Sequence, residues 1–312
     1  MNKIFFIGLI LLIFLKMSLE YVLTKKNPKK NVLRTKKYNI PVGFKLSECD
    51  VPCYVKPRRG INSDLHVSVE GRTESFRYSM EGSGHYRQLE YKEKHHFGLA
   101  TTSFKSDIPL PYFSWAEYNI KTPPVDFNKV IHGASFAARN CASLNSREKW
   151  VKGLQDMVRV DSMSSCLHNA EWPKNILRSD KAGMMSKYLF HLAFENECSE
   201  DYVTEKVWGA LSSGTVPIYY GAPNILDHVP EHSVINVADF DSVESLGRYL
   251  TFLMNDEQEY NRYHEWRFKD YSDEFKKKFS FTRTHSECRA CRMVFADIHG
   301  LKFDHFKQEI IH

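Results

Sequence analysis

Residues 130–255 alternate short apolar runs with amphipathic segments, and this pattern constrains the fold more than any other feature of the chain. Runs rich in β-branched and aromatic residues predict strands, whereas apolar residues at helical spacing predict helices. The predicted strands are 130–137, 158–161, 188–194, 215–220 and 233–237, and the predicted helices are 147–157, 202–212 and one capped by Ser242. Strands that alternate with helices form a parallel, Rossmann-like sheet, which binds ligands beyond the carboxyl ends of its strands.

The composition is that of an ordinary globular protein. The chain has 312 residues, 42% apolar and 26% charged, which excludes a disordered, collagen-like or coiled-coil chain and fits about two domains. Its net charge of +5 suits a protein that handles anions and is too small to indicate nucleic-acid binding. Residues 24–45 are basic and predict a short stem, and Pro123-Pro124 separates the irregular segment 46–125 from the regular pattern that follows.

An uninterrupted apolar run occupies residues 4–15, near the N-terminus. We expect a signal anchor over residues 1–23 and a single-pass membrane protein. A cleaved signal peptide is the alternative, because the run alone is shorter than the roughly 20 residues that span a bilayer. The excess of Lys and Arg follows the run, at 25–37, and this charge pattern alone would place the body of the protein in the cytoplasm.

The seven cysteines point to a compartment through their spacing. They lie at positions 49, 53, 141, 166, 198, 288 and 291. In a secretory lumen they predict disulfides. In the cytosol, the C-x3-C at 49–53 with the C-x2-C at 288–291 would instead suit a zinc ion. The spacing alone leaves both open.

One segment combines the features of an anion site. Strand 188–194 is followed by Glu195 and Asn196, and the next predicted helix opens with Tyr202, Glu205 and Lys206. A helix N-terminus presents unpaired N–H groups, and Lys206 adds positive charge, so this helix start suits a diphosphate. Glu205 can accept hydrogen bonds from ribose hydroxyls, and Glu195 is expected to position the loop. The alternative is a surface helix start with a solvated Glu–Lys pair.

The block 190–230, FHLAFENECSEDYVTEKVWGALSSGTVPIYYGAPNILDHVP, resembles the signature of the α1,3-fucosyltransferase family. Further segments resemble the family in the same order, at 78–86, 101–118, 139–147, 161–169 and 286–291. The resemblance spans about residues 45–292. SMEGSGHY (79–86) and YFSWAEY (112–118) are most similar to plant-type core α1,3-fucosyltransferases, which modify the innermost N-acetylglucosamine of N-glycans.

This resemblance implies an α/β glycosyltransferase of GT-B architecture, with two facing Rossmann-like domains after the N-terminal anchor. The acceptor-side domain is then 46–125, the GDP-fucose-binding domain 126–280, and the segment 281–312 returns to the acceptor domain. The family is similar to type II Golgi membrane proteins, so we expect a luminal catalytic body despite the charge pattern near the N-terminus.

The resemblance also implies a reaction. L-Fucose moves from GDP-β-L-fucose, with inversion, to O3 of the innermost N-acetylglucosamine. Glu81 matches the family's base, and the residues that match donor-binding positions are Arg147, Asn196, Tyr202, Glu205 and Lys206. No metal is required by this logic, because Arg147 and Lys206 supply the positive charge, and Mn²⁺ or Mg²⁺ would be stimulatory at most. Acceptor-binding residues and oligomeric state are not assigned.

Several alternatives remain open at this point. Antennary N-acetyllactosamine could be the acceptor, or the chain could be an inactive glycan-binding relative. The aromatic residues Tyr112, Phe113, Trp115 and Tyr118 could line an acceptor cleft or pack in the core. The family pattern implies that Cys49 and Cys53 pair with Cys288 and Cys291 in an unspecified order, that Cys141 pairs with Cys166, and that Cys198 is left over.

Overall fold

The structure, a computed structural model, describes residues 44–45, 49–56, 64–84 and 96–311. All of them belong to one compact unit, Ile40–His312. The predicted anchor and nearly all of the predicted stem lie outside the described residues. In the part of the chain that the structure describes, no helix is both long and apolar enough to cross a membrane.

The first sheet has five strands in sequence order. They are β1 (Phe44–Lys45), β2 (Tyr54–Val55), β3 (Leu65–Val69), β4 (Arg72–Tyr78) and β5 (Gly98–Ala100). Strands β1 to β4 pair antiparallel, and only β5 joins its neighbour in parallel. The described part of this sheet therefore differs from the Rossmann-like half that the resemblance implies. Its β3–β4 hairpin turns at Glu70 and Gly71, which both have positive φ, 50° and 87°, as a tight hairpin turn requires.

The second sheet is fully parallel, as the alternating pattern predicts. Its strands are β6 (Ile131–Phe136), β7 (Val160–Ser162), β8 (Tyr188–Phe194), β9 (Val216–Tyr220) and β10 (Ile235–Asn236), in the order β10-β9-β8-β6-β7. Strand β8 is central, and all seven of its residues are buried. Its carboxyl end therefore lies in the middle of the edge where ligands of such sheets bind.

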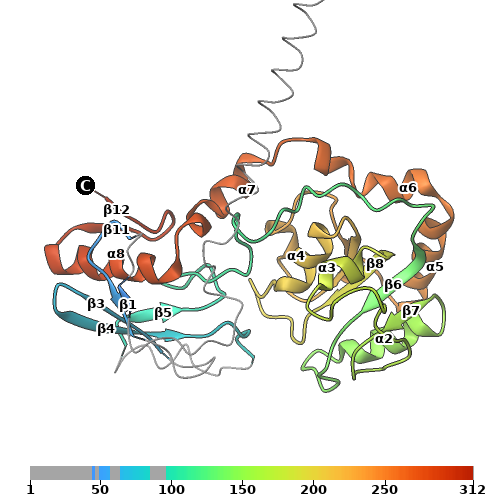
Figure 1. The fold of residues 1–312 in the computed structure, drawn as a ribbon, viewed down its shortest axis with the longest axis horizontal. Coiled ribbons are helices and arrows are strands. Elements are labelled where there is room, and N and C mark those ends of the chain that lie inside the picture. The colour runs from blue at the N-terminus through green and yellow to red at the C-terminus, as the bar shows by residue number, and fades with distance from the viewer. Residues whose placement is uncertain (1–43, 46–48, 57–63, 85–95, 312) are drawn as a thin grey trace, which may run out of the picture. The chain divides into compact units, whose positions relative to one another are not determined.

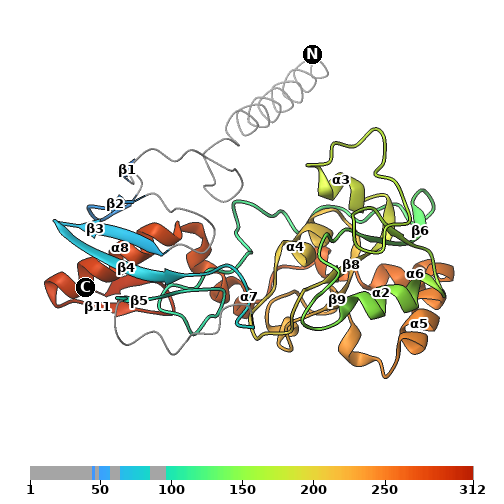
Figure 2. The ribbon, with the colours of Figure 1, turned by 90° about the horizontal axis from the view of Figure 1, so that it is seen from below.

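Helices surround the second sheet and connect it to the first (Figures 1 and 2). The α-helices are α2 (Arg147–Gln155), α3 (Lys181–Met185), α4 (Glu205–Ser212), α5 (Val243–Asn255), α6 (Glu257–Arg262), α7 (Asp273–Lys278) and α8 (Ser286–His299). The 3₁₀ turns are η2 (Ile225–Asp227), η3 (Val237–Asp239), η4 (Glu265–Phe268) and η5 (Ser280–Arg283), and β11 (Lys302–Asp304) pairs with β12 (Glu309–Ile311). The predicted helices 147–157 and 202–212 and the helix capped by Ser242 correspond to α2, α4 and α5.

Helix α4 begins three residues later than predicted, so Tyr202 precedes it. Asp201 has a left-handed backbone, with φ 63°, and Val203 N–H donates to the Asp201 carbonyl in a turn. Helix α5 begins as predicted, because Ser242 accepts a hydrogen bond from Ser245 N–H and forms a capping box.

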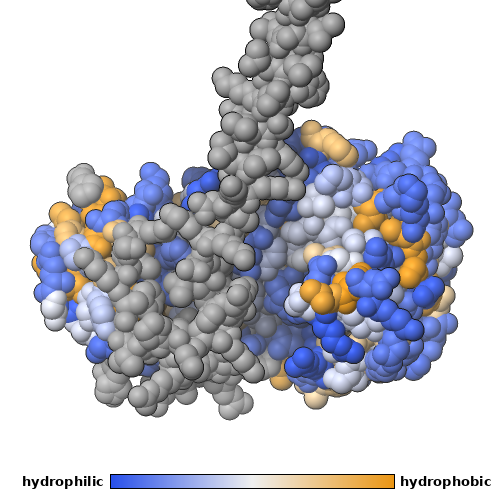
Figure 3. Space-filling view, viewed as in Figure 1, coloured by the Kyte–Doolittle hydropathy of each residue, from blue (hydrophilic) through white to orange (hydrophobic). Residues whose placement is uncertain are grey.

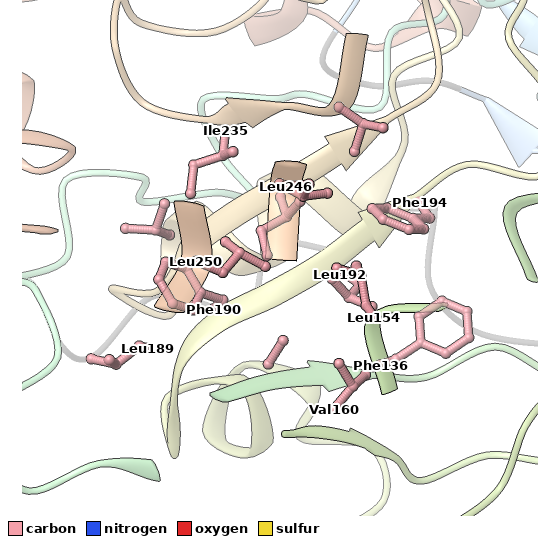
Figure 4. Packing of buried hydrophobic residues seen from close by; sticks show 14 of the residues in the cluster. Phe136, Leu154, Val160, Leu189, Phe190, Leu192, Phe194, Ile235, Leu246 and Leu250 are labelled. Carbon is pink, nitrogen blue, oxygen red and sulfur yellow. The ribbon is translucent and has the colours of Figure 1, made fainter. Parts of the chain in front are cut away.

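Two apolar clusters cover the two faces of the parallel sheet. In one, α2 and α5 pack on the strands: Leu154, Leu246 and Leu250 lie near Phe190 and Leu192 (Figure 4). The other cluster lies under α4 and contains, among other residues, Trp208, Tyr219 and Phe113. Apolar residues thus fill both sides of the sheet, and the visible described surface is largely hydrophilic with scattered apolar patches (Figure 3).

Three disulfides tie distant segments together. Cys49 pairs with Cys288, Cys53 with Cys291, and Cys141 with Cys166. This confirms the predicted disulfides and supplies the order that the sequence left open. The zinc alternative for Cys49, Cys53, Cys288 and Cys291 is wrong, because each of their sulfurs is bonded to another cysteine. The first two bridges hold α8 against the first sheet, where Ala290 and Val294 join its apolar core. Cys198 is free and exposed.

Candidate active site

A buried carboxylate joins the end of β8 to the start of α4. Glu195 follows β8 directly and is fully buried. Its Oε1 accepts a hydrogen bond from the N–H of Thr204 at 2.8 Å, and its Oε2 accepts one from the Thr204 hydroxyl at 2.8 Å. Thr204 is the N-cap of α4 but makes no cap hydrogen bond of its own. Glu195 therefore satisfies the N–H of the N-cap residue itself, as a carboxylate of a capping box does.

Lys206 lies in the first turn of α4 and is held by these same groups. Its Nζ donates to Glu195 Oε2 at 2.9 Å and to Thr204 Oγ1 at 2.7 Å, and it lies 3.5 Å from Glu205 Oε1. Burial opposes its charged form, but the carboxylates of Glu195 and Glu205 outweigh burial and raise the pKa of Lys206. With 23% of its side chain exposed, Lys206 offers a fixed positive charge to a ligand.

Glu205 is more open than its neighbour, with 41% of its side chain exposed. Burial favours its neutral form, but the charges of Lys206 and Lys181 outweigh burial and lower the pKa of Glu205. It is therefore an ionised hydrogen-bond acceptor beside the ammonium group. The alternative prediction of a solvated Glu–Lys pair does not describe Lys206, whose ammonium group is bound to buried Glu195.

Arg147, the first residue of α2, points toward the same edge of the sheet. It is 3% exposed, and its Nη1 donates to the Phe194 carbonyl at 2.6 Å while Nη2 donates to the Asn140 carbonyl at 3.1 Å. Burial lowers the pKa of Arg147, against the raising effect of the nearby Glu195. If Arg147 binds a diphosphate in a bidentate way, the diphosphate has to replace these carbonyl contacts.

Asn196 is half-buried in the loop after β8, and its carbonyl accepts a hydrogen bond from Leu144 N–H at 2.8 Å. The loop between β6 and α2 is thereby joined to the loop between β8 and α4. Both loops lie at the carboxyl edge of the sheet, where parallel sheets bind their ligands.

Tyr202 connects this edge with Glu81. The tyrosine is 3% exposed, and its hydroxyl donates to Glu81 Oε2 at 3.3 Å. Burial, followed by the charge of Glu195, raises the pKa of Tyr202, so the hydroxyl keeps its proton and acts as a donor. Glu81 itself is half-buried at the Gly-containing turn after β4. The carboxylate predicted as base thus lies against the loop predicted to bind the donor.

The four aromatic residues of 112–118 all pack in or against the apolar cluster that contains Trp208. Phe113 is fully buried and packs on Trp208 with ring centroids 4.8 Å apart, as a core residue. Trp115 and Tyr118 pack against the same cluster and are partly buried. Tyr112 packs against the same cluster, and its hydroxyl also donates to the Met80 carbonyl at 2.9 Å, next to Glu81.

A buried polar network behind the site escaped the sequence analysis. The carboxylate of Asp201 accepts hydrogen bonds from Phe104 N–H, Asn224 Nδ2 and His228 Nε2 at 2.9, 2.9 and 3.0 Å, and from the Ser103 hydroxyl at 3.3 Å. Asp201 and His228 are 6% and 1% exposed. The network fixes the backbone just before Tyr202. No local spacing signals it, because its members lie far apart in the sequence.

A family model described as "Glycosyltransferase family 10 (fucosyltransferase) C-term" matches residues 128–304, which is more than half of the chain. The chain belongs to glycosyltransferase family 10. The matched segment contains Arg147, Glu195, Asn196, Tyr202, Glu205 and Lys206, whereas Glu81 precedes it. The matched segment covers the whole parallel sheet and extends through α8, which packs against the first sheet.

Individual relatives cover the family 10 chain to different extents. A "Putative fucosyltransferase-like protein" of Arabidopsis thaliana is 32% identical over 78% of this chain and 48% of its own length. A "GDP-fucose protein O-fucosyltransferase 3" of Gallus gallus is 38% identical over 43% of this chain and 30% of its own. A solved structure titled "Crystal Structure of alpha1,3-Fucosyltransferase with GDP-fucose" shares 26% identity and a TM-score of 0.40 over 50% of this chain and 43% of that one. The chain thus spans about half or less of the length of these relatives.

A separate hollow of about 980 Å³ lies beside β10 in this family 10 domain. Tyr263 and Trp266 are among its walls, and the exposed ring of His232 stacks on Tyr263 at 4.3 Å. Neither Glu81 nor Lys206 lines it, so this hollow is not the site built at the end of β8.

Proposed function

We propose that the protein is an inverting fucosyltransferase that takes L-fucose from GDP-β-L-fucose, with a GT-B arrangement in which the parallel-sheet domain binds the donor. Membership in family 10 supports the reaction class. The observation that carries the proposal is the Tyr202–Glu81 contact of 3.3 Å. This contact brings the carboxylate of Glu81, from the turn after β4, to the loop that leads into Lys206.

The chemical step is a single displacement. The oxygen of the acceptor hydroxyl forms a bond to C1 of fucose while the bond from C1 to the diphosphate oxygen breaks. Glu81 takes the hydroxyl proton, a role in which a carboxylate contributes roughly 10²- to 10⁴-fold to the rate. The hydrogen bond from Tyr202 holds one carboxylate oxygen, which leaves the other oxygen for the acceptor.

The leaving GDP gains negative charge on its diphosphate, and fixed cations stabilise that charge best when they need no reorganisation. Lys206 is such a cation, because Glu195 and Thr204 already hold its ammonium group. Arg147 adds positive charge from beneath the same edge. Glu205 is assigned to the ribose hydroxyls, and Asn196 and Tyr202 to the donor loop.

We propose that no metal ion is required, because Lys206 and Arg147 supply the charge that a divalent cation would otherwise provide. Mn²⁺ or Mg²⁺ would then stimulate the reaction at most, by pairing with GDP. Activity that survives treatment with EDTA supports this assignment. Activity that EDTA abolishes and Mn²⁺ restores contradicts it.

The first acceptor that we propose is O3 of the innermost N-acetylglucosamine of N-glycans, on the resemblance of the segments around Glu81 and Tyr112. A protein hydroxyl is the second candidate, and it is favoured by relatives whose names specify protein O-fucosylation. Antennary N-acetyllactosamine is a third acceptor that the same donor site would serve.

We also propose a Golgi membrane protein with a luminal catalytic body. The three disulfides support an oxidising compartment. Protease protection of the intact protein in microsomes tests this orientation: a protected catalytic body supports it, and a body digested without detergent contradicts it.

The decisive experiment offers GDP-fucose with three acceptors to protein made in an oxidising secretory host. The acceptors are an N-glycopeptide with exposed N-acetylglucosamine, N-acetyllactosamine and a folded Ser/Thr-containing protein domain, with product linkage read by mass spectrometry. Glu81→Gln should lose transfer but keep GDP binding, and Lys206→Ala should lose both. Glu200→Gln is the matched control, because this glutamate lies on the same loop with 54% of its side chain exposed. Transfer that survives in Glu81→Gln, or no transfer to any acceptor by protein that binds GDP, contradicts the proposal.

A further inference from the structure

We infer that Glu197 is a positioning residue for Glu81: its buried side chain seats the turn 81–84 on the loop between β8 and α4. The expected effect on kcat rests on the proposed function. The contact between Glu197 and the turn 81–84 rests on geometry alone.

Glu197 occupies the space next to two glycines of that turn. It is 3% exposed although it lies in a loop. A Cβ atom added to Gly82 would overlap the Glu197 carboxylate, and one added to Gly84 would overlap its other oxygen. Neither glycine has positive φ, so backbone freedom does not explain them. The close approach of the carboxylate does.

Two further contacts join the same pair of segments. The Ser83 hydroxyl donates to the Ser199 hydroxyl at 2.9 Å, and the Tyr202 hydroxyl donates to Glu81 at 3.3 Å. The three partners Glu197, Ser199 and Tyr202 all lie on the loop between β8 and α4. Glu197 and Tyr202 are both buried, and Glu197 lies against Gly82, which follows Glu81 directly in the chain.

The loop between β8 and α4 thus holds Glu81, the proposed base, in position relative to the residues proposed to bind the donor. Proton transfer from an acceptor depends on the position of Glu81, and a misplacement of about 1 Å can cost roughly 10²-fold in rate. Lys206, which is assigned to the diphosphate, is held by Glu195 and Thr204. Loss of Glu197 should therefore lower kcat for transfer and leave GDP affinity nearly unchanged.

The test compares Glu197→Ala, Gly82→Ala and the double variant with wild type. Glu197→Gln is the conservative variant because it preserves the shape of the side chain. Glu200→Ala is the matched control because it removes an exposed carboxylate of the same loop. The measurements are hydrogen exchange of the peptide that covers 76–84, thermal unfolding, GDP affinity, and kcat with GDP-fucose.

We expect Glu197→Ala to speed exchange at 76–84 and to lower kcat by about 10- to 100-fold, with GDP affinity within about threefold of wild type. Glu197→Gln should stay closer to wild type than Glu197→Ala. Gly82→Ala should be harmful in the wild-type background and should add little in Glu197→Ala, because the space is then free. If the two residues act independently, Gly82→Ala should be equally harmful in the wild type and in Glu197→Ala.

Glu197→Ala that matches Glu200→Ala in exchange and kcat would overturn the inference. The inference would also be overturned if the losses of stability and kcat in the double variant equalled the sum of those in Gly82→Ala and Glu197→Ala. If the wild-type protein transfers fucose to no acceptor, the proposed function fails, and exchange at 76–84 with the unfolding cycle still decides whether Glu197 seats the turn.

Discussion

Replacing Asp201 with Asn should destabilise the protein more than any single exposed substitution near the site. The two carboxylate oxygens of Asp201 accept four hydrogen bonds, two on each oxygen. An amide of the same shape turns one oxygen into a donor, so two of these bonds are lost. At about 1.5 to 3 kcal/mol for each hydrogen bond to a buried charged group, the loss is about 3 to 6 kcal/mol.

The pH dependence of this loss follows from the pKa of Asp201. Burial acts to raise it, but hydrogen bonds from His228, Phe104 N–H and Asn224 outweigh burial and lower the pKa well below its ordinary value. A carboxylate with a lowered folded-state pKa contributes stability that is fully present above its unfolded pKa of about 3.9. That contribution is lost as the pH falls through the folded-state pKa.

Urea unfolding of wild type and Asp201→Asn, followed by tryptophan fluorescence at several pH values, measures both effects. The difference between the two proteins should be constant from roughly pH 5 to 7 and should shrink below about pH 4. Glu200→Gln is the control, since it removes only an exposed ion pair with Lys105, which water and salt screen. A difference for Asp201→Asn below about 1 kcal/mol, or one that grows in acid, would refute the reasoning.

Three further substitutions probe the frame around the site. Arg267→Ala should cost about 3 kcal/mol or more in urea unfolding, because buried Arg267 donates to the carbonyls of Ile120, Thr122 and Leu211; a smaller loss than in Ser242→Ala would contradict this. Replacing Cys141 and Cys166 with Ser should cost about 3 kcal/mol, since their bridge closes a loop with a sequence separation of 25; an unchanged denaturation midpoint without reductant would argue against it. Ser242→Ala should cost about 1 kcal/mol through loss of the capping box of α5, and Ser242→Asp should restore most of that loss; equal unfolding curves for all three proteins would exclude the cap.

The parallel sheet was predictable because its signals are local. Residues 188–194 form an apolar run whose observed strand has the predicted bounds, and the spacing of Leu246, Leu250 and Leu253 marks the buried face of α5. The start of α4 was predicted three residues early because the true start depends on Glu195, which binds the Thr204 N–H across the loop. A contact of that kind leaves no periodic trace in the sequence.

The first sheet shows a different kind of error. The alternation of Leu65, Val67 and Val69 with polar residues, followed by Glu70-Gly71, is a hairpin signal, which contradicts the prediction of an irregular segment over 46–125. The buried pattern of β3 follows this alternation. The parallel pairing of β4 with β5 could not be predicted from a local pattern. The two strands lie on either side of residues 85–95, and no local pattern specifies which strand pairs with the free edge of β4.

The ion pair at the start of α4 is better explained by function than by stability. Burial raises the pKa of Glu195, and a buried ion pair of this kind is often no more stabilising than apolar residues of similar volume. Yet the pair has one specific consequence: it keeps the ammonium group of Lys206 charged and partly exposed at the carboxyl end of β8. In the loop before Lys206, Tyr202 and Glu197 contact the turn that carries Glu81. A single loop of the parallel sheet thus sets the position of both the cation proposed for the leaving diphosphate and the base proposed for the acceptor, so the distance between the two reacting ends depends on this loop.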